Sequence, residues 1–98
     1  MDVEFDDDDL DDLEVNPRAT CGFSPAAVMG YRKAMQVIRG AVDERDLYAM
    51  KGLRFEKLVG KRKDQRSLRC NDPYRLIIQL IGDGRRKKVR VIEIVDYH

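Results

Sequence analysis

The spacing of apolar residues changes near Leu53, and this change constrains the fold more than any other feature of the chain. Before Leu53, apolar side chains recur every three or four residues, as on one face of a helix. After it, they alternate with polar residues or run together, as in strands. Helices followed by strands predict an α+β fold, with two helices packed on one face of a mainly antiparallel sheet of about four strands. A chain of 98 residues allows one such domain, residues 1–98.

The first fourteen residues combine a strand pattern with an acidic helix pattern. Residues 1–5 alternate apolar and acidic side chains, which predicts a short strand. Leu10 and Leu13 then stand at helical spacing among aspartates, and acids in a first turn complement the helix dipole. We expect a short helix over residues 6–14.

The second helix is the best-marked element of the sequence. Ser24 suits the N-cap, and Pro25 suits the first helical position, where its missing N–H costs nothing. Gly40 is the expected C-terminal stop, and residues 43–50 favour one more short helical turn. The predicted apolar stripe comprises Val28, Tyr31, Met35, Ile38 and Val42.

Four strands are predicted in the second half of the chain. They cover residues 55–59, 65–71, 74–81 and 89–95. In the second of them, Leu68 and Cys70 are expected to face the core. Ser67 and Arg69 therefore point the other way.

Charge is unevenly distributed along the chain. Residues 1–14 hold nine acids and no base, whereas the remainder carries ten more bases than acids. Such a basic region attracts nucleic acid or an acidic protein surface. Most surface lysines are simply solvated, but Arg69 and Arg75 stand within apolar strands. A guanidinium there is costly unless it meets a carboxylate or a phosphate, so these two are stronger candidates for binding.

Several classes of protein are disfavoured by the composition. Two cysteines, Cys21 and Cys70, and a single histidine predict no zinc site, and both thiols are expected to be reduced. The sequence has neither a glycine-rich phosphate loop nor a Ser–His–acid pattern, and we expect no cofactor. It also lacks a signal peptide and an apolar run near the ~20 residues of a membrane span. A cytoplasmic protein without membrane attachment is therefore expected.

The sequence ends in Asp96-Tyr97-His98, a combination suited to metal-free phosphodiester cleavage. An imidazole with a pKa of about 6.5 can transfer a proton at neutral pH. A phenol can donate to a phosphate oxygen or stack on a base. An aspartate can orient the imidazole or act as the base itself. Neighbouring arginines would stabilise the charge of the pentacoordinate phosphate.

The last fifty residues contain four motifs in a recognisable order. They are Lys57-Leu58-Val59-Gly60-Lys61-Arg62, Gln65-Arg66-Ser67-Leu68-Arg69-Cys70-Asn71-Asp72, Tyr74-Arg75-Leu76 and Glu93-Ile94-Val95-Asp96-Tyr97-His98. Together they resemble the HigB toxins of the RelE/ParE superfamily of bacterial toxin–antitoxin modules. The resemblance implies a RelE-like fold and an mRNA interferase that acts in the ribosomal A site. Such an enzyme activates the ribose 2′-hydroxyl against its own phosphate, leaving a 2′,3′-cyclic phosphate and a free 5′-hydroxyl.

The resemblance also implies roles and partners. Asp96 and His98 would exchange protons, Tyr97 would position RNA, and Arg75 would stabilise the transition state. The implied RNA- and phosphate-binding residues are Lys57, Lys61, Arg62, Arg69 and Arg54. The implied partners are a HigA-type helix-turn-helix antitoxin, the ribosome with its mRNA, and operator DNA only through the antitoxin complex.

One position departs from the family pattern. Arg54 stands where some relatives carry an active-site histidine, and arginine cannot act as a base at neutral pH, so proton transfer would fall on the C-terminal trio. Two alternatives share the fold. One is a ParE-like inhibitor of DNA gyrase, which would not need that trio. The other is an attenuated toxin relative that serves as an antitoxin- or DNA-binding module.

Overall fold

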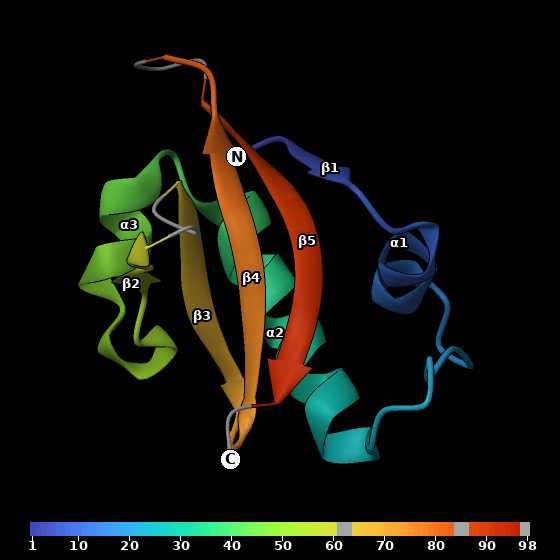
Figure 1. The fold of residues 1–98 in the computed structure, drawn as a ribbon. Coiled ribbons are helices and arrows are strands. Elements are labelled where there is room, and N and C mark those ends of the chain that lie inside the picture. The colour runs from blue at the N-terminus through green and yellow to red at the C-terminus, as the bar shows by residue number, and fades with distance from the viewer. Residues whose placement is uncertain (61–63, 84–86, 97–98) are drawn as a thin grey trace.

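A mixed sheet with helices packed behind it forms the fold (Figure 1). The computed structural model describes residues 1–60, 64–83 and 87–96. Over these residues the helices are α1 (Asp8–Val15), α2 (Pro25–Gly40) and α3 (Glu44–Ala49), with a 3-10 turn η1 (Lys51–Leu53). The strands are β1 (Val3–Phe5), β2 (Glu56–Lys57), β3 (Gln65–Asn71), β4 (Tyr74–Ile81) and β5 (Lys88–Asp96). The predicted α+β class is therefore confirmed. Over the described residues the sheet has five strands where about four were expected, and the short helical turn expected over residues 43–50 is α3.

The strands follow the order β1-β5-β4-β3-β2. β1 runs parallel to β5, with Val3 opposite Val89, and the other neighbours are antiparallel. β2 is shorter than the strand expected over residues 55–59. Phe55 is buried in the core and Val59 is exposed, so only the two residues between Phe55 and Leu58 pair along the edge of the sheet.

α2 supplies the helical side of the core. Val28, Tyr31, Met35 and Ile38 are buried, as their spacing predicts. The prediction for Val42 is wrong, since that side chain is 83% exposed. The helix ends at Gly40 and the next residue is extended, so helical spacing no longer decides which side chain turns inward.

α2 lies directly on β3 because Gly30 has no side chain. A Cβ at this position would lie 2.0 Å from the carbonyl oxygen of Cys70. The glycine is thus explained by the close approach of helix and strand.

The acidic helix α1 is held against α2 by hydrogen bonds to its backbone. The Tyr31 hydroxyl donates to the carbonyl of Leu10 at 2.7 Å, and Arg32 Nε donates to that of Leu13 at 3.0 Å. Arg32 thus satisfies carbonyls at the end of α1 that have no partner within the helix. Figure 1 shows α1 (blue) beside the β1 edge, across the sheet from β2. None of the helices in the described parts of the chain is long and apolar enough to span a membrane.

Candidate functional site

The face of the sheet opposite α2, called the outer face below, carries a group of polar side chains. Along β4, Leu76 and Ile78 belong to the core beneath α2, so Arg75 and Ile77 face outward. Across the β3–β4 ladder, Ser67 pairs with Ile77 and Arg69 pairs with Arg75. In Figure 1 α2 lies behind the sheet and the outer face turns toward the viewer.

Arg75 is the centre of this group. Its side chain is only 12% exposed, and Nη2 donates to the carbonyl of Arg54 at 2.7 Å and to Ser67 Oγ at 2.8 Å. Glu56 Oε2 lies 3.9 Å from the same nitrogen. Arg75 Nε is buried and has no hydrogen-bond partner in the described part of the chain. An enclosed guanidinium with an unused donor is well suited to receive an anion.

Local packing places the groups around Arg75. Leu53 and Phe55 are both buried, so the chain between them is anchored at each side. Arg54 lies between them in the left-handed region, with φ of 47°, and its carbonyl accepts the hydrogen bond from Arg75. Glu56 then pairs with Ser67 across β2 and β3, which brings its carboxylate to the outer face.

Arg69 has a partner within its own turn. Its Nη2 and Nε donate to the carboxylate of Asp72 at 3.0 and 3.3 Å. The expectation that a strand arginine meets a carboxylate or a phosphate is thus met by a carboxylate here. Both side chains are substantially exposed, so the pair contributes little stability and leaves Arg69 accessible to a further anion.

The other sequence-predicted residues are dispersed. Lys57 pairs with Arg66, one step along from the pair that faces outward, so it lies on the helix side of the sheet. Asp96 ends β5 and pairs with Tyr74, the residue before Arg75. Because neighbouring residues of a strand face opposite sides of the sheet, Asp96 and Arg75 belong to different faces. Four further predicted residues lie outside the described residues. They are Lys61, Arg62, Tyr97 and His98.

Two residues at this site had no predicted role. Ser67 was placed on the outer face by strand parity alone, yet it is 1% exposed and holds Arg75. No sequence motif marks Glu56, because its approach to Arg75 depends on the pairing of β2 with β3.

The described part of the outer face includes neither a thiol nor a cluster of metal-binding side chains. Cys21 and Cys70 are both free, and burial raises the pKa of Cys70 to about 12. Among the described residues, no three His, Cys, Asp or Glu side chains gather as a metal site would require. Among the described residues, the outer face presents guanidinium and carboxylate groups and the hydroxyl of Ser67.

Comparison with known proteins places the fold. No protein-family model matches the sequence, and no curated protein matches it. Eight solved chains do match the structure, among them a YoeB/ParE toxin from Agrobacterium tumefaciens. The two chains share 17% identity and a TM-score of 0.61, with the whole of each covered. The protein thus has the fold of a YoeB/ParE toxin, in agreement with the RelE-like fold expected from its motifs.

Proposed function

We propose that the protein is the toxin of a toxin–antitoxin module, of HigB type within the RelE/ParE superfamily, and that it cleaves mRNA on the ribosome. The observation that carries the proposal is the enclosed guanidinium of Arg75. It lies beside the exposed carboxylate of Glu56, and its buried Nε has no hydrogen-bond partner among the described residues. The toxin fold and the order of the four C-terminal motifs support the same function.

The outer face suits attack by a ribose 2′-hydroxyl on its own phosphate. Arg75 would hold the phosphate and stabilise the charge that accumulates on it. Glu56 is 64% exposed and close to that guanidinium, so it would take the 2′-hydroxyl proton. The 2′ oxygen then bonds to phosphorus as the bond from phosphorus to the 5′ oxygen breaks. His98 would give the 5′ oxygen its proton, leaving a 2′,3′-cyclic phosphate and a 5′-hydroxyl.

On this proposal the arginine at position 54 does not deprive the site of a base. Glu56 would serve as the base, and the segment around Arg54 would contribute its backbone carbonyl to the placement of Arg75. The RNA backbone would be bound by the remaining cations of the predicted set. These are Arg54, Lys57, Lys61, Arg62 and Arg69.

The proposed partners follow from the same function. The substrate is mRNA on the ribosome, and a HigA-type antitoxin would neutralise the protein and link it to operator DNA. The exposed edge formed by the short strand β2 and the basic residues near it fits an acidic partner better than a basic one. A cytoplasmic location is part of this proposal.

Mapping of mRNA 5′ ends during tightly controlled expression tests the proposal. Wild type and the exposed-surface control Lys33→Gln should produce cuts that require translation. Arg75→Gln and Glu56→Gln should each lower cutting by roughly 10²-fold or more, and His98→Ala by a similar factor. Unchanged cutting in Arg75→Gln would overturn the proposed site. Growth arrest with intact mRNA and inhibited DNA supercoiling would instead identify a gyrase inhibitor.

A further inference from the structure

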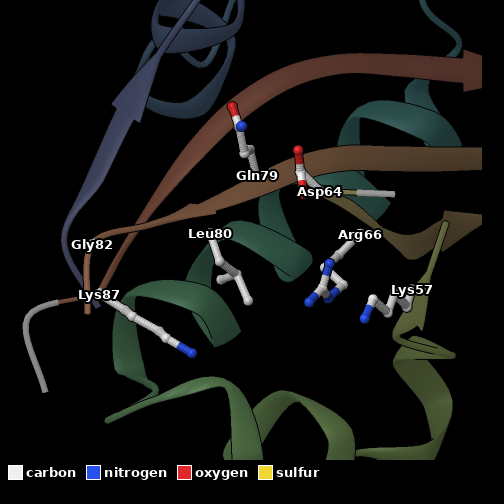
Figure 2. A pocket seen from close by; sticks show the side chains of 7 residues that line it. All are labelled: Lys57, Asp64, Arg66, Gln79, Leu80, Gly82 and Lys87. Atoms are coloured by element: carbon white, nitrogen blue, oxygen red, sulfur yellow. The ribbon is translucent and has the colours of Figure 1, made fainter. Parts of the chain in front are cut away.

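A pocket of about 330 Å³ lies at the end of the sheet where β4 leads toward β5 (Figure 2). Its described lining consists of Lys57, Asp64, Arg66, Gln79, Leu80, Gly82 and Lys87. Figure 2 shows Lys57, Arg66 and Lys87 reaching toward the same opening from β2, β3 and the residue before β5. This pocket is separate from the site around Arg75, which is on the opposite face of the sheet.

Arg66 and Lys57 form an unusual pair for neighbouring strands. They are direct partners in the β2–β3 ladder, and like charges directly opposite each other are destabilising unless an anion lies between them. Arg66 donates from Nη1 to the carbonyl of Gln65 at 3.2 Å. Its Nε is buried and has no hydrogen-bond partner within the described residues. The guanidinium therefore has an unused donor beside a second cation.

Lys87 brings the third positive charge and has a carboxylate already bound. Its ammonium pairs with Glu44, the first residue of α3, and both side chains are largely covered. Asp64 is the one acid among the described lining residues. Two carboxylates do not balance three cations, so the pocket keeps a positive charge.

We propose that this pocket binds a phosphate of an RNA backbone, as a second contact point besides Arg75. This inference rests on the RNA-directed function proposed above. A protein partner would fit less well, because Leu80 is the only large apolar side chain among the described lining residues. Protein interfaces owe their affinity to desolvated, largely apolar centres, whereas nucleic-acid interfaces are polar and strongly positive.

The two contact points, Arg66 and Arg75, are close enough for one RNA strand to touch both. Arg66 pairs with Ile78, which is three residues from Arg75 along β4, a separation of roughly 10 Å. The two guanidinium groups are on opposite faces, so an RNA strand that touches both must pass around the edge of the sheet. That edge is formed by β2, which is only two residues long.

Binding of a short 2′-O-methyl oligouridylate, followed by fluorescence anisotropy at several salt concentrations, tests the pocket without cleavage of the probe. Arg66→Gln should reduce the salt slope by about 0.7 and weaken binding about fivefold near 0.1 M salt, as expected for one lost phosphate contact. Lys33→Gln, an exposed lysine of α2 outside the pocket, should change both quantities much less. Glu44→Gln should tighten binding, because it removes the carboxylate that competes for Lys87.

Thermal melting checks that each variant is folded, and Lys87→Gln replaces Arg66→Gln if the latter does not fold. Equal losses for Arg66→Gln and Lys33→Gln would overturn the inference. The inference would also be overturned if Arg66→Gln weakened binding of polyglutamate but not of RNA, because that result would point to an acidic protein partner. Arg66-dependent RNA binding together with intact cellular mRNA would leave the pocket standing and refute the proposed cleavage.

Discussion

Replacing Gly30 by alanine tests how α2 is set on the sheet. The added Cβ would lie 2.0 Å from the carbonyl oxygen of Cys70 and 2.5 Å from its carbonyl carbon. Favourable contacts between such atoms need about 3.5 Å. The backbone of β3 cannot rotate aside like a flexible side chain, so α2 must move away from the sheet. Overpacking of this kind costs about 1–3 kcal/mol or more, and the better helix propensity of alanine offsets at most about 1 kcal/mol.

Urea denaturation followed by circular dichroism measures the effect. We expect Gly30→Ala to lower the free energy of unfolding by about 2 kcal/mol and the Tm by roughly 8–16 °C, values that apply to a domain of this size. Gly40→Ala is the matched control, because Gly40 ends the same helix and a Cβ there has no atom within 4 Å. The control should be as stable as wild type or slightly more so. Equal stability of the two variants would refute the close packing of α2 on β3.

Three further predictions concern individual side chains. Glu56→Gln should lower the rate of mRNA cleavage by roughly 10²- to 10⁴-fold with an unchanged Tm, and full activity would rule out this carboxylate as the base. Burial raises the pKa of Cys70 to about 12, so in the native protein this thiol should react with Ellman's reagent far more slowly than the exposed second thiol. Two fast-reacting thiols before denaturation would contradict that burial. Hydrogen bonds from Lys88 and then Arg90 lower the pKa of Glu4 below its ordinary 4.5. Because a lowered pKa stabilises the fold above pH 4.5 and this contribution is lost as the pH falls, Glu4→Gln should be less stable than wild type at neutral pH. The difference should shrink in acid, and a difference independent of pH would show that the ion pairs do not contribute.

Much of the fold could be predicted because local signals mark the ends of its elements. The observed β3 and β4 have the predicted bounds, since turn residues interrupt two runs of strand-forming side chains. Ser24 begins α2 as expected, and its Oγ accepts from the backbone N–H of Ala27. The error at Val42 arises where the chain leaves the helix, because the direction of the following residues is set by tertiary packing.

The candidate site was less predictable, because it depends on register between strands. Arg75 could be singled out, since a guanidinium within an apolar strand needs a partner. Its neighbours Ser67 and Glu56 could not be, because their approach requires the pairing of β2 on β3 and the left-handed turn before it. The same register turns Lys57 away from Arg75, and a shift of one residue would reverse that placement.

The position of β5 in the sheet has a consequence for biosynthesis. β5 is the last of the described strands to be synthesised. It pairs with β1, the first of them, on one side and with β4 on the other. Until β5 has emerged, β1 has no neighbour in the sheet, and β4, which carries Arg75, can pair only with β3. Pairing between such distant segments is slow compared with helix formation. The nascent chain therefore remains without its completed outer face until β5 has emerged.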